Sequence, residues 1–158
     1  MIIPLMVISD IRNTAAVKME AFEDAKKLVR DKGIINIGCG TRRLTEASKS
    51  IANDLMVVVN TDVVSENVPN FIQNDIGKEP LPFDDKEFDV SFCSHVLEHI
   101  DDWETALNEI VRVSDKVVLV LPSPDSIGNK FSPEHKHYFS VEDIERMMRE
   151  NPTVRIYY

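Results

Sequence analysis

The sequence predicts an α/β fold in which a doubly wound, mostly parallel sheet carries helices on both faces. Short apolar runs typical of buried strands alternate along the chain with segments whose apolar residues recur every three or four positions. This alternation is typical of strand–helix–strand units, whose right-handed connections place helices on both sides of one sheet. The chain of 158 residues has the length of a single domain, and it contains no linker or internal repeat.

The first predicted element is a helix over residues 13–31. Its apolar positions recur at helical spacing and include Val17 or Lys18, then Phe22 and Ala25. Gly33 is placed to end it. The apolar residues 1–8 are too few to cross a bilayer and lack a basic signal region, so we expect them to form a docking strand or arm.

Strands and helices are predicted to alternate over residues 34–113. Residues 34–37 form a short apolar strand, and residues 55–60 form a continuous apolar run that is typical of a strand buried on both sides. The segment 41–53 between them places Leu44, Ala47 and Ile51 on one helical face. A weaker strand at 70–74, an alternating strand at 88–93 and a helix over 103–113 follow.

Residues 116–121 are the clearest buried strand. The long loop after it, residues 122–139, contains three prolines, and loops of this length usually carry function. Ser140 and Asp143 then resemble a capping box that opens a helix over 141–150. The final strand, residues 153–158, either pairs with 116–121 or leaves a sheet edge free for a second copy of the chain, so a homodimer is one expectation.

The net charge and the cysteine content indicate which partners and which cellular compartment to expect. The formal net charge of −9 disfavours nucleic-acid binding, which needs a basic face. Cys39 and Cys93 each follow an apolar run, so we expect two buried, reduced thiols in a cytoplasmic protein that does not bind a membrane.

Polar residues follow three of the predicted strands. Gly38 and Gly40 form a turn that lets a ligand approach the backbone closely, and the following helix offers unpaired N–H groups. Asp62 stands where a carboxylate can accept from both hydroxyls of a ribose, and Asp75 can accept from an amine. A dinucleotide fingerprint fails because Arg43 replaces the third glycine.

The stretch from residue 34 to about 148 resembles the class I S-adenosylmethionine-dependent methyltransferases, particularly their small-molecule "type 11" branch. The matching segments are "INIGCGT", "VNTDVV", "NDIGKEPLPFDDKEFDVSFCSHVLEHIDD", "VVLVLPSP" and "HKHYFSVEDIERMM". The resemblance implies a Rossmann-like methyltransferase fold that here lacks the usual last strand. It divides the single domain 1–158 into an N-terminal arm and helix (1–32), a cofactor-binding core (33–121) and a substrate-side loop, helix and last strand (122–158).

The resemblance also assigns a cofactor-binding role to each matching position. It implies that Gly38, Cys39 and Gly40 wrap the methionine part of S-adenosyl-L-methionine, and that Asp62 and the adjacent Val63 hold the ribose. By the same resemblance, the adenine meets Asp75 and Ile76, and the methionine side is lined by Ser94 and His95.

Three positions depart from the family pattern. Asn36 stands where the family usually carries an acidic residue, so we expect weaker cofactor binding than in a typical member. Arg42 and Arg43 replace residues that are often small, and they either crowd the turn or bind the cofactor's carboxylate.

Methyl transfer mainly requires alignment of the acceptor with the methyl group and exclusion of water. A hydroxyl acceptor would need a base, and we expect His95 or His137 to supply it. His95 and His99, with Glu98 between them, superficially suggest a metal-binding pair of histidines, but no further convergent ligand follows in the sequence, so no metal is predicted.

The predicted function is therefore transfer of a methyl group from S-adenosyl-L-methionine to a small-molecule acceptor, whose identity the sequence does not show. The main alternative is a catalytically inactive, methyltransferase-like binding or regulatory module, which Asn36 and the short C-terminal part favour. A nicotinamide-dependent enzyme is a third interpretation.

Overall fold

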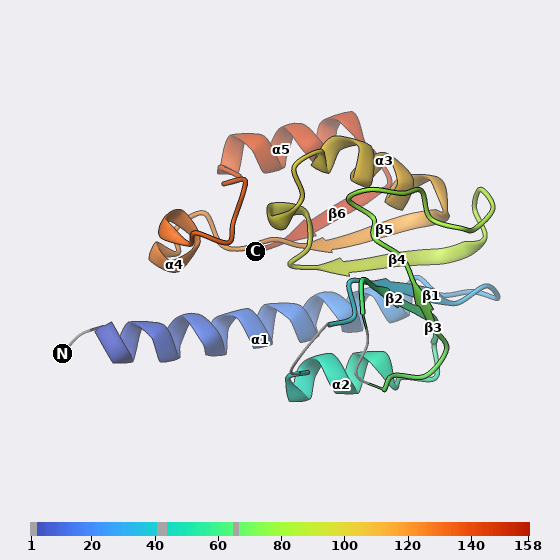
Figure 1. Ribbon diagram of the computed structural model, residues 1–158, viewed down its shortest axis with the longest axis horizontal. Coiled ribbons are helices and arrows are strands. Elements are labelled where there is room, and N and C mark those ends of the chain that lie inside the picture. Colours follow the sequence, from blue (N-terminus) through green and yellow to red (C-terminus); the bar gives the residue numbers. More distant parts are fainter. Residues whose placement is uncertain (1–2, 41–43, 65–66) are drawn as a thin grey trace.

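Six parallel strands form one sheet in the order β3-β2-β1-β4-β5-β6 (Figure 1). The computed structural model describes residues 3–40, 44–64 and 67–158, and the side chains of 14–40, 44–64, 67–126 and 129–158. Strand order reverses between the neighbours β1 and β4, which is where this class of sheet binds ligands. The strands are β1 (Ile34–Ile37), β2 (Val57–Asp62), β3 (Phe71–Gln73), β4 (Phe88–Ser94), β5 (Ser114–Val120) and β6 (Val154–Tyr157).

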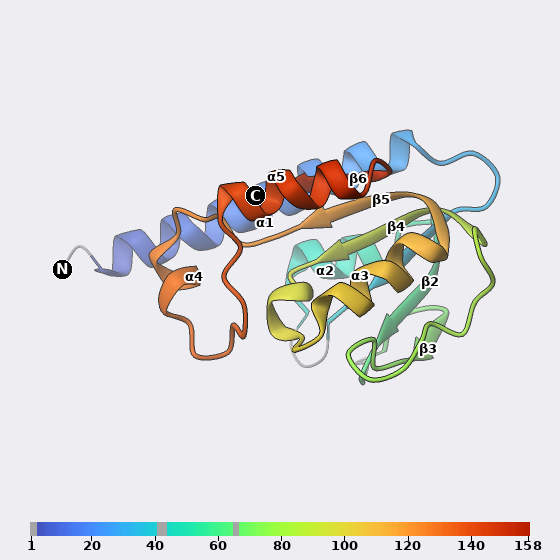
Figure 2. The ribbon, with the colours of Figure 1, turned by 90° about the horizontal axis from the view of Figure 1, so that it is seen from above.

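Helices cover both faces of the sheet, as predicted. Figures 1 and 2 show α1 and α2 on one face and α3 and α5 on the other. The faces have separate apolar cores because side chains alternate along each strand. In β5, for example, Val117 and Leu119 pack on the α3 and α5 side, whereas Val118 and Val120 pack with α1. The helices are α1 (Ile3–Lys27), α2 (Glu46–Ala52), α3 (Trp103–Arg112), α4 (Ile127–Phe131) and α5 (Val141–Glu150), with a 3₁₀ turn, η1 (Leu97–His99).

The C-terminal half follows the sequence prediction closely. α5 begins with a complete capping box, in which Asp143 N donates to Ser140 Oγ over 3.1 Å and Ser140 N donates to Asp143 Oδ2 over 2.9 Å. The last strand pairs directly with β5, with Val154 opposite Val117, which is one of the two arrangements that we expected. The long loop, however, is not irregular throughout, because α4 forms within it behind the N-cap Ser126.

Two predictions near the N-terminus were wrong. The apolar residues for which a docking strand was one expectation are helical from Ile3 onward, so α1 begins earlier than predicted and ends at Lys27 rather than at 31. The predicted helix 41–53 begins only at Glu46, because the Thr45 hydroxyl accepts from Ser48 N over 3.1 Å and caps the helix there. Residues 41–43, with Arg42 and Arg43, lie outside the described residues.

β2 is less buried than predicted. It begins at Val57 rather than at Leu55, which is 98% exposed, and Val58 is 40% exposed. The pairing with β1 shifts register between Ile34 and Ile35, so Val58 is an extra residue without a partner in the ladder and turns outward.

Within the described part of the chain, no helix is long and apolar enough to cross a membrane.

Candidate functional site

A cavity of about 510 Å³ lies at the carboxyl ends of β1, β2 and β4. These strands are neighbours, so the residues that follow them meet at one edge of the sheet. All of the predicted cofactor-binding residues except Asn36 line the cavity: Gly38, Cys39, Gly40, Asp62, Val63, Asp75, Ile76, Ser94 and His95.

The glycine turn is held tightly against the end of β2. The N–H groups of Gly38 and Cys39 both donate to the carbonyl oxygen of Thr61, over 2.8 and 3.0 Å. Gly38 has a φ of 74°, and a Cβ there would lie 2.2 Å from Cγ2 of Val96. Two features therefore exclude a side chain at position 38. One is the positive φ, and the other is the contact with the Val96 side chain.

Asp62 is fixed by the same turn. Its Oδ2 accepts from Gly40 N over 2.9 Å, and its Oδ1 accepts from Val63 N over 2.7 Å. Burial raises the pKa of Asp62 above its usual value; the two backbone hydrogen bonds oppose this shift, and the negative charge of Asp75 adds to it. The carboxylate is thus oriented before any ligand arrives, with lone pairs left to accept further hydrogen bonds.

Two polar atoms at the end of β4 have no partner within the chain. Ser94 Oγ and His95 Nε2 are both buried without a hydrogen bond, although their residues line the cavity. Buried polar atoms are nearly always satisfied, so these two indicate a place for a polar ligand. His95 also has a φ of 57°, an uncommon conformation that its N–H stabilises by donating to Val120 O over 2.9 Å.

Lys18 is a cavity residue that our site prediction missed. It reaches the cavity from α1, and its Nζ donates to Ser48 Oγ over 2.8 Å. Burial lowers the pKa of Lys18. The sequence held a partial signal for Lys18, because the helical pattern placed either Val17 or Lys18 on the buried face of α1. The spacing alone does not show which group the Lys18 ammonium contacts.

Asn36 lies outside the cavity lining. Its side chain is buried on the opposite face of β1 from Ile35 and Ile37, where Nδ2 donates to Asn60 Oδ1 over 2.8 Å. Asn60 Nδ2 donates in turn to the carbonyl oxygens of Ala52 and Pro69. The amide of Asn36 therefore takes part in an internal network.

His137, the second predicted base, also lies apart from the cavity residues. Its Nε2 is 3.0 Å from the carbonyl oxygen of Asp101, and its ring lies beside Trp103 and Phe139. His135, two residues earlier, instead lines a second cavity.

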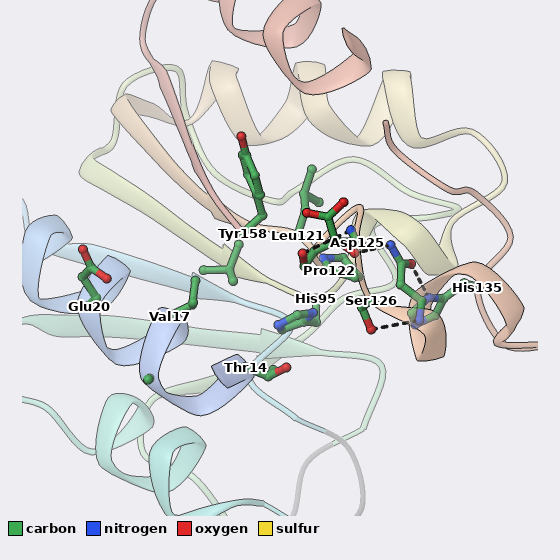
Figure 3. Close-up of a pocket in the computed structure, with 14 residues that line it drawn as sticks. Thr14, Val17, Glu20, His95, Leu121, Pro122, Asp125, Ser126, His135 and Tyr158 are labelled. Carbon is green, nitrogen blue, oxygen red and sulfur yellow. Dashed lines mark hydrogen bonds between the residues drawn. The ribbon is translucent and has the colours of Figure 1, made fainter. Parts of the chain in front are cut away.

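This second cavity, of about 560 Å³, adjoins the first through His95, which lines both. Figure 3 shows Thr14, Val17 and Glu20 of α1 on one side of it and Asp125 with Ser126 of the loop after β5 on the other. Its charged lining side chains are the carboxylates Glu20 and Asp125, within the described residues.

Both cysteines are buried, as predicted, and they lie on or directly after the neighbouring strands β4 and β1. Burial raises the pKa of Cys39 to about 11 and raises the pKa of Cys93 further. At neutral pH both side chains are thiols, which are poor nucleophiles.

Comparisons with known proteins show the family of this chain. Residues 35–117 match the family model described as a methyltransferase domain. Over 73 residues, 41% of this chain, the sequence is 40% identical to the uncharacterized protein MJ0638 of Methanocaldococcus jannaschii. Over 93 residues, 52% of this chain, it is 36% identical to a tRNA U34 carboxymethyltransferase of Nautilia profundicola. The matches span 32% and 30% of those two relatives, so about a third of their length.

The fold also matches a solved structure. A SAM-dependent methyltransferase of Thermotoga maritima, described as a possible histamine N-methyltransferase, superposes with a TM-score of 0.55 at 17% identity, covering 91% of this chain and 76% of that one. At this identity the likeness concerns the fold alone. The family match spans more than half of the chain and coincides with the strands that build the first cavity, and the chain thus belongs to the methyltransferase domain family.

Proposed function

We propose that this chain binds S-adenosyl-L-methionine in the first cavity and transfers its methyl group to a small-molecule acceptor in the second. The observation that carries the proposal is the placement of His95, which lines both cavities at the end of β4. Two adjoining cavities would hold the two reactants of a transfer next to each other, which is the proximity that such a reaction needs.

The residues present fit the cofactor. The cavity of about 510 Å³ lies within the range of roughly 300–1,000 Å³ that is usual for small-molecule sites. Asp62 offers two oriented oxygens for the ribose hydroxyls, and Ser94 Oγ is a buried polar atom without a partner. The ammonium of Lys18 is suited to the cofactor's carboxylate, a role that we considered for Arg42 and Arg43 from the sequence. Asp75 and Ile76 remain candidates for the adenine.

The chain's own contribution to the reaction is positioning and proton removal. When bound, S-adenosyl-L-methionine supplies a methyl group already activated by its sulfonium. His95 lines both cavities, and its Nε2 is buried without a hydrogen-bond partner, so this residue is the candidate to accept a proton from the acceptor. His137 carries less support for this role, since its Nε2 lies against the Asp101 carbonyl oxygen.

The lining of the second cavity supports a neutral or cationic acceptor. Glu20 and Asp125 would attract a cation and repel a phosphate. The net charge of −9 also disfavours an RNA acceptor, although one relative is a tRNA-modifying enzyme.

Calorimetry with S-adenosyl-L-methionine and S-adenosyl-L-homocysteine tests the cofactor assignment. We expect saturable binding of both by the wild type, and an affinity at least tenfold lower for Asp62→Asn, because a hydrogen bond to a charged group contributes about 1.5–3 kcal/mol. Asp84→Asn is the matched control, since Asp84 is exposed before β4 at the far end of the sheet. Equal affinity of Asp62→Asn and wild type, or binding of a nicotinamide cofactor alone, would contradict the assignment.

A second assay separates the enzyme from an inactive module. Formation of S-adenosyl-L-homocysteine is followed with a panel of amines, phenols and thiols. An active methyltransferase releases it with at least one acceptor, and His95→Ala slows the release. Cofactor binding without release across the panel would instead favour the binding or regulatory module.

A further inference from the structure

Glu98, in the 3₁₀ turn after β4, has a buried carboxylate without a hydrogen-bond partner. Its exposed fraction is 0%, and neither Oε1 nor Oε2 accepts a hydrogen bond. The nearest basic group is the imidazole of His95, whose Nδ1 lies 3.6 Å from Oε2, which is longer than a hydrogen bond. Burying a carboxylate costs free energy unless it is paired or binds a metal ion. A bound cation would therefore stabilise this group.

Two further histidines meet at this carboxylate. One ligand atom from each of Glu98, His99 and His135 lies within 4.8 Å of the other two, and the imidazole rings of His99 and His135 are 4.9 Å apart between centroids. His135 comes from the loop after β5. That loop is held in place because Lys136 N and His137 N donate to the Glu98 carbonyl oxygen over 2.7 and 3.1 Å. The fold thus supplies the third ligand that the sequence pattern lacked.

The two rings are oriented in the way that metal-binding histidines usually are. Nδ1 of His99 lies 3.0 Å from the carbonyl oxygen of Glu134, and Nδ1 of His135 lies 2.9 Å from Oδ1 of Asn129. Asn129 is itself fixed, since its Nδ2 donates to Ser123 O over 3.1 Å. An oxygen acceptor at Nδ1 places the proton there and makes Nε2 the atom that each ring would offer to a metal, which is the common outer-shell arrangement.

We propose that Glu98, His99 and His135 bind a divalent transition-metal ion, with Zn²⁺ as the best match. Two imidazoles and one carboxylate suit zinc, whereas magnesium prefers oxygen ligands, and three protein ligands leave a coordination position open. The site lies between the two cavities, because His99 lines the first and His135 lines the second. An acceptor oxygen or nitrogen in the second cavity is the natural candidate for the open position.

Metal binding is measured without S-adenosyl-L-methionine, so its outcome is independent of the proposed methyl transfer. Untagged full-length protein is freed of metal with a chelator and titrated with Zn²⁺ against a chromophoric competitor. We expect one equivalent of Zn²⁺ with a Kd in the micromolar range or below, and at least a tenfold lower affinity for Glu98→Gln and for His135→Ala. The matched control is His137→Ala, a histidine of the same loop outside the cluster, which keeps the wild-type affinity.

Co²⁺ gives a second, spectroscopic measurement. The wild type is expected to show the visible absorption bands of four- or five-coordinate Co²⁺, and His135→Ala is expected to lose them. Thermal unfolding of metal-free protein checks the fold of each variant; should Glu98→Gln fail to fold, His135→Ala on the loop decides the question. The proposal is overturned if the wild type shows no saturable Zn²⁺ binding, or if His135→Ala binds Zn²⁺ as tightly as the wild type.

Discussion

Asn36 and Asn60 are joined side chain to side chain across the neighbouring strands β1 and β2, with Nδ2 of Asn36 2.8 Å from Oδ1 of Asn60. Asn60 is fully buried, and its own Nδ2 donates to the carbonyl oxygens of Ala52 at the end of α2 and Pro69 before β3. Every donor and acceptor of the Asn60 amide thus has a partner. The donor of Asn36 completes this network, at a position where the family resemblance led us to expect an acid.

Replacing Asn36 with an acid is therefore expected to destabilise this chain. In Asn36→Asp a carboxylate would face the Asn60 carbonyl oxygen, and turning the Asn60 amide round would leave the oxygens of Ala52 and Pro69 unpaired. A buried polar group without its partner costs about 1–3 kcal/mol, so urea unfolding at pH 7 should show a loss of that size. Asn108→Asp, on the exposed face of α3, is the control and should change stability by less than about 0.5 kcal/mol. Equal stability of Asn36→Asp and wild type would contradict this account of the network.

Gly38→Ala tests the close contact at the glycine turn. The new Cβ would lie 2.2 Å from Cγ2 of Val96, in addition to the cost of the φ of 74°. The backbone conformation alone costs about 1–2 kcal/mol, and the clash adds to it. In a double-mutant cycle by denaturant unfolding, Val96→Ala should recover part of the loss but leave the backbone cost. Strictly additive effects would show that Val96 is not the obstacle.

Lys18→Met tests which end of the cofactor faces α1. Loss of an ammonium next to the cofactor's carboxylate should lower the affinity for S-adenosyl-L-homocysteine about tenfold, the effect of roughly 1.4 kcal/mol. Methylthioadenosine lacks the amino-acid end, so its affinity should not change. Lys27→Met, on the same helix with a side chain 76% exposed, is the control. An equal loss of affinity for both ligands would indicate that Lys18 has a structural role instead.

Asp89 gives a prediction about acid stability. Its Oδ2 accepts from the N–H groups of Arg30, Lys32 and Gly33, over 2.8, 2.7 and 3.0 Å, which anchors the connection between α1 and β1 to β4. Burial raises the pKa of Asp89, but the three backbone donors and the charge of Lys32 lower it more, so the net pKa lies below its usual range.

A carboxylate with a lowered pKa stabilises the fold fully above its unfolded pKa of about 3.9 and loses this effect as the pH falls through the folded value. Asp89→Asn should therefore be less stable than the wild type by about 1–3 kcal/mol at pH 7, and the gap should narrow as the pH falls below about 4. Urea unfolding between pH 7 and pH 3 measures the gap. A difference that is independent of pH would exclude the charge as its source.

The sequence predicts most of the helices and strands, and nine of the residues that line the first cavity. The buried run of β5, the cap of α5 and the helical spacing of α3 depend on residues a few positions apart, so they are visible in the chain. The convergence of Gly38 and Asp62 was also visible, since the carboxyl ends of neighbouring parallel strands meet at one edge of a sheet.

The tertiary structure was needed to show which side chains of the helices and loops meet at the two sites. Lys18 reaches the first cavity because α1 packs against α2, β4 and β5, whereas the helical pattern marked it only as one alternative for a buried position. His135 rather than His137 joins Glu98 because two backbone N–H groups of the loop bond to the Glu98 carbonyl oxygen. Such contacts depend on the path of a loop and on packing between elements, and neither is encoded in local spacing.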